Sequence, residues 1–276
     1  MSYEVLLATG RDEGADADKR LDIALVYIDE GGVKQTSDFF ERIGEKSNRG
    51  DAFENGQLDI CTPITFTKNG QEIKTDKFVA IKIAFHDKDW QLDTVWVTNR
   101  ETGKYLWKKS GLFFGSKAED DRGTPGNPYE LLLDDPIEET VAIQQCDNFK
   151  FTVLTQQGSD SGTNNHVFFK LFDNTGHASV TARNGRDGII FDDFESGETN
   201  VLKDFPSQFG LLSNIISKVL IIKVGDDAWK PEYMEVEPSG LGLTAISKFD
   251  LAGNLPPNEP SLDTHHNWMQ APRKDM

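Results

Sequence analysis

The chain has 276 residues, of which 37% are hydrophobic, and its 18 phenylalanines and 5 tryptophans supply enough apolar side chains for true cores. This composition excludes an intrinsically disordered protein, and the length suits two domains of roughly 120 to 130 residues. The net charge of −17 disfavours nucleic acid as a partner, because phosphate binding needs clustered Lys and Arg.

Short runs rich in β-branched and aromatic residues, many of them alternating, predict strands along the whole chain. In the first half they are residues 3–10, 20–29, 77–87, 93–99 and 104–109. In the second half they are residues 148–156, 165–173, 217–226 and 232–238. The sequences at 101–104 and 173–176 are typical of hairpin turns. The pattern predicts an all-β protein built from sandwiches or barrels, and the series occurs twice.

The densest negative charge lies in the middle of the chain, where residues 119–148 hold nine acidic residues and one basic residue, Arg122. This stretch also contains prolines, which favour an extended connector. We therefore predict four segments: a first sandwich at 1–118, an acidic linker at 119–147, a second sandwich at 148–252, and a proline-rich polar tail at 253–276.

The amino-terminal sequence shows neither a basic region nor an apolar stretch of signal length, and no segment reaches the roughly 18 apolar residues of a membrane span. We therefore expect a soluble protein that is cytoplasmic or otherwise intracellular. Cys61 and Cys146 are too few for a disulfide scaffold and lack metal-site spacing, so we expect buried thiols.

An acidic segment is written twice, as DAFENGQLDI at Asp51–Ile60 and as DDFESGETNV at Asp192–Val201. The flanking segments repeat in the same order: residues 4–26 align with 151–172, and residues 79–97 align with 219–237. Trp90 then matches Trp229. Several matched blocks in one order indicate an internal duplication.

The ordered set of motifs resembles the PLAT domain, the module shared by polycystin, lipoxygenases and the clostridial alpha-toxin. The motifs are a first strand followed by a Gly-containing polar loop, the DAFENG or DDFESG segment, and an apolar strand before a Trp. The resemblance covers about residues 3–118 and about residues 148–238. It implies two tandem eight-stranded antiparallel β-sandwiches, and a non-catalytic role in binding membranes or proteins, often through Ca²⁺ held by loops.

Calcium takes oxygen ligands from carboxylates, amides, backbone carbonyls and water, and both repeats offer them in loops. The residues of the second repeat that match the family's calcium positions are Gly162, Thr163, Asn164, Asp192, Asp193, Glu195 and Asp226, with Asp227 as an alternative to Asp226. Those of the first repeat are Gly14, Asp16, Asp51, Glu54 and Asp87.

The first repeat departs from the family pattern, because Ala15 replaces a threonine and Ala52 replaces a frequent acid. Asp12, Asp18 or water would have to complete its shell, so calcium is expected more strongly in the second repeat. The alternative for both repeats is that these residues only form solvated turns. Phe53 and Phe194, in the centres of the acidic segments, are predicted to be core anchors.

Nothing in the sequence indicates an enzyme, since it contains no G-x-S-x-G motif, no Cys–His arrangement and no phosphate-binding lysine loop. We interpret His86 as a surface or structural imidazole. Asp263, His265 and His266 are interpreted as part of the polar tail.

The expected function is a Ca²⁺-binding protein-interaction or scaffolding module with a protein partner or a larger assembly. One alternative is a calcium-independent structural subunit. Another is a Ca²⁺-dependent peripheral protein that binds membrane lipid through Ile189 and Ile190 or through Leu112–Phe114, although each of these is also interpreted as strand core. Because an acidic chain is repelled by anionic bilayers, a protein partner is favoured.

Overall fold

The structure is a computed structural model of the whole chain. It describes residues 1–11, 20–47, 52–86, 89–115, 123–136, 145–146, 148–159, 161–163, 166–183, 194–206, 212–213, 215–225, 227–239, 246–255, 261–262 and 267–274. The chain divides into two compact units, Met1–Pro136 and Ile137–Met276.

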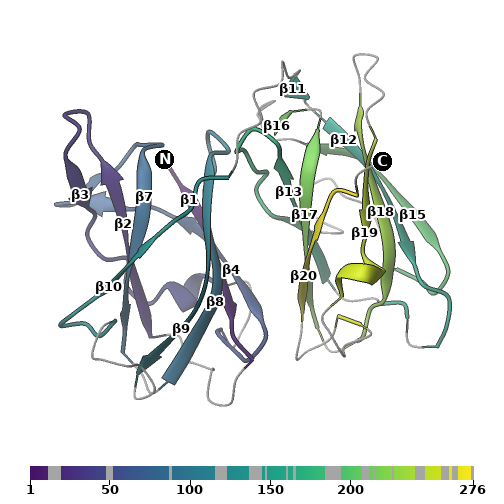
Figure 1. Cartoon of the computed structure of the whole chain (residues 1–276), viewed down its shortest axis with the longest axis horizontal. Coiled ribbons are helices and arrows are strands. Elements are labelled where there is room, and N and C mark those ends of the chain that lie inside the picture. The colour runs from purple at the N-terminus through teal and green to yellow at the C-terminus, as the bar shows by residue number, and fades with distance from the viewer. Residues whose placement is uncertain are drawn as a thin grey trace. The chain divides into compact units, whose positions relative to one another are not determined.

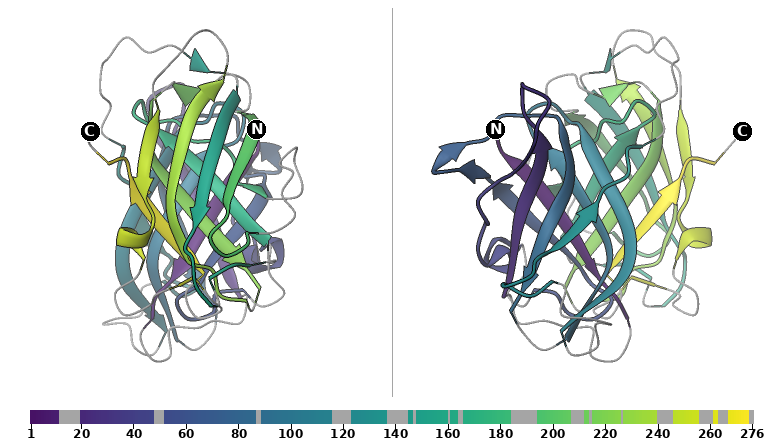
Figure 2. Two further views of the ribbon diagram at one scale, coloured as in Figure 1. Left: turned by 90° about the vertical axis from the view of Figure 1, so that its right-hand side faces the viewer. Right: turned by 60° about the vertical axis from the view of Figure 1, so that its left-hand side comes forward.

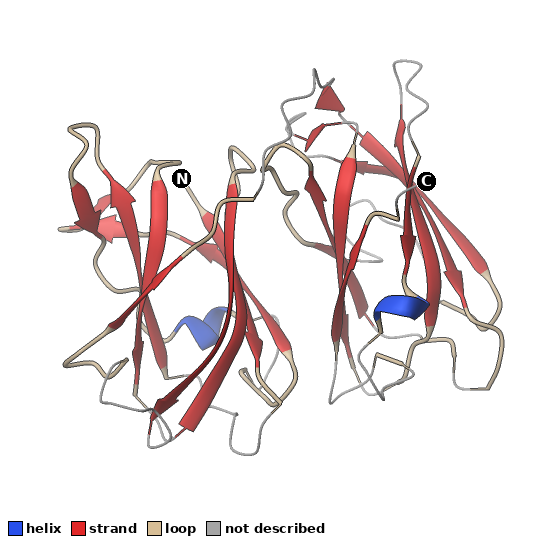
Figure 3. Cartoon of the chain, in the orientation of Figure 1, coloured by secondary structure: helices blue, strands red, loops and turns tan. Residues whose placement is uncertain are grey.

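Almost all regular structure in these ranges is β-strand, which confirms the predicted all-β class. Figure 3 shows the strands together with two short 3-10 helices, η1 (Ile43–Lys46) and η2 (Ala252–Asn254). No helix of the described residues has the length and apolar character needed to cross a membrane.

The first unit contains two four-stranded antiparallel sheets, in the orders β4-β1-β8-β9 and β10-β7-β2-β3, and a small hairpin of β5 and β6 (Figure 1). Its strands are β1 (Tyr3–Thr9), β2 (Leu21–Ile28), β3 (Lys34–Thr36), β4 (Leu58–Ile64), β5 (Thr67–Lys68), β6 (Gln71–Glu72), β7 (Phe78–Phe85), β8 (Asp89–Asn99), β9 (Tyr105–Gly115) and β10 (Tyr129–Leu132).

The second unit contains two further four-stranded sheets, in the orders β15-β12-β18-β19 and β14-β13-β17-β20, and a short pair of β11 and β16. Its strands are β11 (Gln145–Cys146), β12 (Asn148–Thr155), β13 (His166–Asp173), β14 (Ala182–Arg183), β15 (Thr199–Pro206), β16 (Leu212–Ser213), β17 (Ile216–Val224), β18 (Pro231–Ser239), β19 (Ser247–Asp250) and β20 (Trp268–Pro272).

The two units have the same topology. When β12, β15, β18 and β19 are matched to β1, β4, β8 and β9, the strand order of the first sheet is identical, and the second sheet agrees when β13, β14, β17 and β20 are matched to β2, β3, β7 and β10. The turned views of Figure 2 let the layers be followed from other directions. The duplication inferred from the sequence therefore has a counterpart in the fold.

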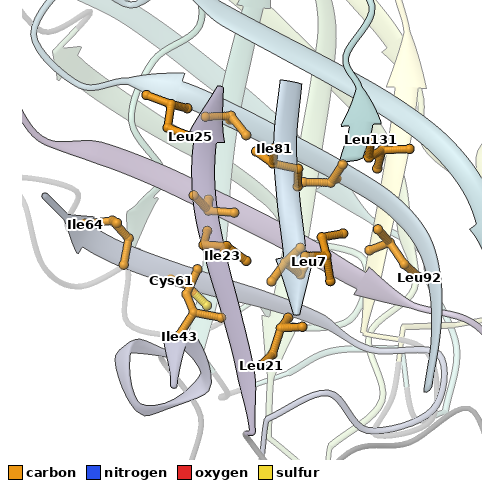
Figure 4. Close-up of a cluster of buried hydrophobic side chains, with 14 of the residues drawn as sticks. Leu7, Leu21, Ile23, Leu25, Ile43, Cys61, Ile64, Ile81, Leu92 and Leu131 are labelled. Atoms are coloured by element: carbon orange, nitrogen blue, oxygen red, sulfur yellow. The ribbon is translucent and has the colours of Figure 1, made fainter. Parts of the chain in front are cut away.

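Each unit is a sandwich because alternate side chains of its two sheets meet in one core. In the first unit Leu7 of β1 shares a cluster with Ile23 of β2 and Ile81 of β7 (Figure 4). Val5 of β1 belongs to the same cluster. In the second unit Phe151 and Val153 of β12 share a cluster with Phe169 of β13 and Ile221 of β17.

Both cysteines are buried and free, as predicted. Cys61 belongs to the core cluster of the first unit together with Ile43 (Figure 4). Burial raises the pKa of the Cys61 thiol well above its ordinary value, and the charges of Asp59 and Glu4 act in the same direction.

The segments predicted as a linker and a tail each supply a strand. Residues 129–132 form β10, which pairs with β7 of the first unit, and residues 268–272 form β20, which pairs with β17 of the second. β10 and β20 are equivalent strands, so the segment predicted as a linker and the segment predicted as a tail form the same element in the two units. The sequence pattern does not predict either strand, because prolines and acidic residues surround both.

Because of Tyr3, we predict that the stability of the first unit falls at alkaline pH. Its ring lies in the core, and its hydroxyl donates a hydrogen bond to the Thr75 carbonyl at 2.8 Å. Burial raises the pKa of Tyr3 from 10.0 to about 12, and the charges of Asp76 and Glu101 act in the same direction.

The folded state holds the phenol proton of Tyr3 more tightly than the unfolded state does. The resulting contribution to the free energy of unfolding is therefore complete below pH 10.0 and is lost as the pH rises to about 12. The expected loss is about 2–3 kcal/mol. Urea unfolding of wild type and Tyr3→Phe, measured by hydrogen exchange of peptides from the first unit, checks this. Parallel pH profiles for the two proteins would contradict it.

Candidate cation site

Three segments of the second unit meet at the end of β12. The described part of the loop after β12 comprises residues 156–159 and 161–163, and the acidic segment enters β15 through residues 194–198. The two are joined by a pair of backbone hydrogen bonds, from the Thr163 amide to the Phe194 carbonyl at 2.8 Å and from the Phe194 amide to the Thr163 carbonyl at 2.9 Å. The Lys230 amide, directly before β18, donates to the Ser161 carbonyl at 3.0 Å.

A serine adds a second connection between the same two segments. The Ser196 hydroxyl lies 3.0 Å from the Gly158 amide, whose hydrogen bond it accepts, and 2.8 Å from the Gly158 carbonyl, to which it donates. The Gly197 amide donates to the Gln156 carbonyl at 3.1 Å. The loop and the acidic segment are therefore joined at Gln156 and Gly158 as well as at Thr163.

Gly162 allows the closest approach. A Cβ atom at this position would lie 2.6 Å from the Phe194 carbonyl oxygen and 3.0 Å from the Ser196 nitrogen, and both atoms belong to the backbone. Only glycine fits without moving the acidic segment.

The acidic segments of the two units turn in the same way. In the first unit the Gln57 amide donates to the Glu54 carbonyl at 3.1 Å, and in the second the Glu198 amide donates to the Glu195 carbonyl at 3.1 Å. The third residue of each turn is a glycine with positive φ, 69° at Gly56 and 75° at Gly197. Such a turn favours glycine, which explains why the motif Phe-Glu-x-Gly is written twice.

The turns are attached to the first strand by equivalent bonds. The Thr9 amide donates to the Gln57 carbonyl at 2.8 Å, as the Thr155 amide does to the Glu198 carbonyl at 3.0 Å. The aligned acidic segments of the sequence thus occupy equivalent places in the two folds.

A tryptophan and a phenylalanine close the core behind each acidic segment. Phe53 and Trp90 have ring centroids 5.5 Å apart, and Phe194 and Trp229 have theirs 4.7 Å apart. Each indole N–H donates to a threonine hydroxyl at 3.1 Å, that of Thr9 for Trp90 and that of Thr155 for Trp229. The prediction that Phe53 and Phe194 are core anchors is confirmed, since both are fully buried.

Four of the predicted ligands belong to the described residues. The structure brings Gly162 and Thr163 beside Glu195, whose side chain is exposed, and it places Glu54 half-buried at the equivalent position of the first unit. Asp227, the alternative ligand, is exposed in the loop between β17 and β18. The predicted ligands that lie outside the described residues are Gly14, Asp16, Asp51, Asp87, Asn164, Asp192, Asp193 and Asp226.

The described donors suit a hard cation in type, because an exposed carboxylate lies beside backbone carbonyls. The Thr163 carbonyl is one of these backbone acceptors, and it accepts the Phe194 amide. Within the described ranges, no group of three or more His, Cys, Asp or Glu side chains is placed to hold a metal ion.

Sequence reasoning missed the polar residues whose side chains hydrogen-bond to these loops and to the core behind them. They are Thr9, Thr155, Ser196, Ser47 and Asp59. An isolated Ser or Thr gives no local signal in the sequence. Asp59 does give one, because it lies on an apolar strand between Leu58 and Ile60, and a buried charge needs hydrogen-bond partners.

Two further predictions concern residues outside the loops. His86 Nε2 lies 2.6 Å from Asp22 Oδ2, and the Asp22 Oδ1 atom accepts the Arg42 amide at 2.7 Å, so the imidazole belongs to a surface network. Phe114 is buried and stacks on Trp90 with ring centroids 5.4 Å apart, in agreement with the strand-core interpretation, whereas Leu112 and Phe113 on the same strand are half-buried. Ile189, Ile190, Asp263, His265 and His266 lie outside the described residues.

Comparison with known proteins gave no relative: no protein-family model matches the chain, and no curated protein matches it.

Proposed function

We propose that the chain is a non-catalytic, Ca²⁺-binding pair of PLAT-like modules that binds a protein partner or a larger assembly, with its main cation site in the second repeat. The observation that carries the proposal is the backbone pairing of Thr163 with Phe194. It joins two segments that are far apart in the sequence and that both contain predicted ligands. Asn164 follows Thr163 directly in the sequence, and Asp193 directly precedes Phe194.

The loop and the acidic segment are held together without a bound cation. Gly162 permits the close approach, and the Ser196 hydrogen bonds hold the loop against the turn that carries Glu195. A bound Ca²⁺ would supply positive charge among carboxylates and would order the loop ends. The residues of the chain would bind the ion and present the ordered loops to the partner.

A protein partner is favoured over an anionic membrane because the chain carries a net charge of −17. Repulsion from an anionic surface has to be overcome before apolar contacts form. Two modules in one chain would also raise the effective concentration of the second contact once the first has formed.

Calorimetric titration of the whole chain with CaCl₂ after EDTA treatment tests the cation site. We expect binding heat and a rise in melting temperature for wild type, both strongly reduced in Asp192→Ala and Asp193→Ala. Glu237→Ala is the matched control, because it removes a half-exposed carboxylate that pairs with Lys150 on the sheet of the same unit. If wild type gives neither heat nor a melting shift, the calcium proposal fails and a calcium-independent structural subunit takes its place.

Co-sedimentation with vesicles containing phosphatidylserine, with and without Ca²⁺, tests the kind of partner. We expect the protein to stay in the supernatant in both conditions. Calcium-dependent sedimentation would overturn the choice of a protein partner in favour of a membrane.

A further inference from the structure

Each unit is completed by a segment that joins its two sheets. This closing segment comprises residues 129–135 in the first unit and residues 268–274 in the second, that is, β10 or β20 with the residues directly after it. In the first unit the Leu133 amide donates to a carbonyl of β7 at 3.0 Å. The next amide, that of Asp134, donates to the Trp107 carbonyl of β9 at 2.7 Å. Consecutive residues of the segment therefore bond to different sheets.

The closing segment of the second unit makes the same double connection. The Arg273 amide donates to the Ser217 carbonyl of β17 at 2.8 Å, and the Lys274 amide donates to the Lys248 carbonyl of β19 at 2.8 Å. Both closing segments thus cover the edges of two sheets, and edge strands have backbone groups that can pair with another chain.

Asp134 and Lys274 occupy equivalent positions. The carbonyls that accept their amides belong to Trp107 and Lys248. Each of these two residues pairs with the residue six positions after the matched tryptophan of its unit. The two units therefore hold an acid and a base at the same place in the fold.

The two closing segments carry opposite charge. The first, YELLLDD, holds three acidic residues and no basic one, whereas the second, WMQAPRK, holds two basic residues and no acidic one. The Asp134 carboxylate lies 3.1 Å from Lys108 Nζ on β9. In the second unit Lys274 Nζ lies 4.0 Å from the Asp250 carboxylate on β19. Each segment therefore meets its opposite charge on the strand that it covers.

The first closing segment meets further lysines. Glu130 pairs with Lys34 on β3 and lies 3.9 Å from Lys82 on β7, and Asp135 lies 3.6 Å from Lys104. All of these side chains are partly exposed, so each pair contributes little to stability. Such pairs have a larger effect on the choice between partners, because a like charge at the same place repels.

The buried side chains distinguish the two closing segments much less. Leu131 pairs with Ile81 in the first unit, Met269 pairs with Ile221 in the second, and all four are buried. Leucine and methionine have similar volumes and replace one another in cores at small cost. Repeated units in one chain are prone to pairing between the wrong units, and these apolar contacts do not prevent it.

We propose that charge assigns each closing segment to its own unit. The edge at Lys108 accepts an acidic strand, and the edge at Asp250 accepts a basic one. In the wrong unit, Asp134 would lie close to Asp250, and Lys274 would lie close to Lys108. Surface pairs that add little to stability thereby exclude the wrong strand. This inference is independent of calcium binding and of the proposed function.

The test exchanges single residues between equivalent positions in the whole chain. Asp134→Lys places the residue of the second unit beside Lys108, and Asp134→Lys with Lys108→Asp restores an opposite pair. Leu131→Met is the matched control, because it places the buried residue of the second unit in the same segment. The readout is the protection of the Trp107 amide against hydrogen exchange, measured by nuclear magnetic resonance, since this amide donates to the carbonyl of residue 134 at 3.2 Å.

We expect Asp134→Lys to lower the protection of the Trp107 amide about threefold to tenfold, through loss of one ion pair and gain of a repulsion. The double variant with Lys108→Asp should recover most of it, and Leu131→Met should change it little. Unchanged protection in Asp134→Lys, an equal loss in Leu131→Met, or no recovery in the double variant would each overturn the proposal.

Refolding tests the assignment itself. In Asp134→Lys with Lys274→Asp, each closing segment carries at this position the charge that suits the other unit. After refolding from urea at high protein concentration, light scattering should show species heavier than refolded wild type, because closing segments pair with units of neighbouring chains. If the variant refolds to the mass of wild type with full protection of the Trp107 amide, charge does not assign the segments.

Discussion

Trp229→Ala lowers the free energy of unfolding of the second unit by about 3–5 kcal/mol, the usual cost of removing a large buried aromatic side chain. The indole is fully buried. Its ring packs on Phe194 at 4.7 Å, and its N–H donates to the Thr155 hydroxyl at 3.1 Å. The substitution therefore leaves a cavity and removes the donor of a buried hydrogen bond.

The effect should be measured as urea unfolding monitored by hydrogen exchange of peptides from residues 148–239, because a chain with two units need not unfold in one step. Tyr233→Ala is the control, since Tyr233 lies on the same strand and is half-exposed. It should cost much less. Trp90→Ala should reproduce the loss in peptides of the first unit, where Trp90 packs on Phe53 and donates to Thr9. Equal costs for Trp229→Ala and Tyr233→Ala would contradict the prediction.

Gly162→Ala, which adds a single methyl group, is the second substitution with a large expected effect on stability. Gly162→Ala places a Cβ atom 2.6 Å from the Phe194 carbonyl oxygen, which cannot move without moving the backbone of the acidic segment. Forcing an extra methyl group into a packed site costs about 1–3 kcal/mol. The loop and the segment must separate, so the two hydrogen bonds between Thr163 and Phe194 should be lost.

Hydrogen exchange of the Thr163 and Phe194 amides, measured by nuclear magnetic resonance, gives the direct readout, and both should exchange faster. The control is Gly126→Ala, because a Cβ at Gly126 meets no atom within 4 Å. Calcium affinity of the second repeat should fall with Gly162→Ala and stay unchanged with Gly126→Ala. Unchanged protection of both amides in Gly162→Ala would show that the contact is less tight than the structure has it.

Much of the fold was predictable because its signals are local. Alternating apolar residues predict strands such as 148–156 and 232–238, and these form β12 and β18. The turn at 101–104 was recognisable from its glycine, and Gly103 has a φ of 75°. The duplication was visible because Phe-Glu-x-Gly and the matching tryptophans are required by a turn and by a core that both units share.

The strands β10 and β20 were not predictable in the same way. Their sequences, YELL and WMQAP, stand among prolines and acids that favour a connector. Each becomes a strand because an edge of the sheet, at β7 in one unit and at β17 in the other, offers unpaired backbone groups. That information lies in distant residues.

The candidate site shows the same division. The sequence by itself determined which residue types are available, where they recur, and that the second copy keeps an acid at Asp193 where the first has Ala52. Only the tertiary structure decided that the Phe194 amide meets Thr163 while the Phe53 amide meets Asp59. A hydrogen bond between segments far apart in the chain depends on how the strands bring them together, and no local pattern of residues encodes that choice.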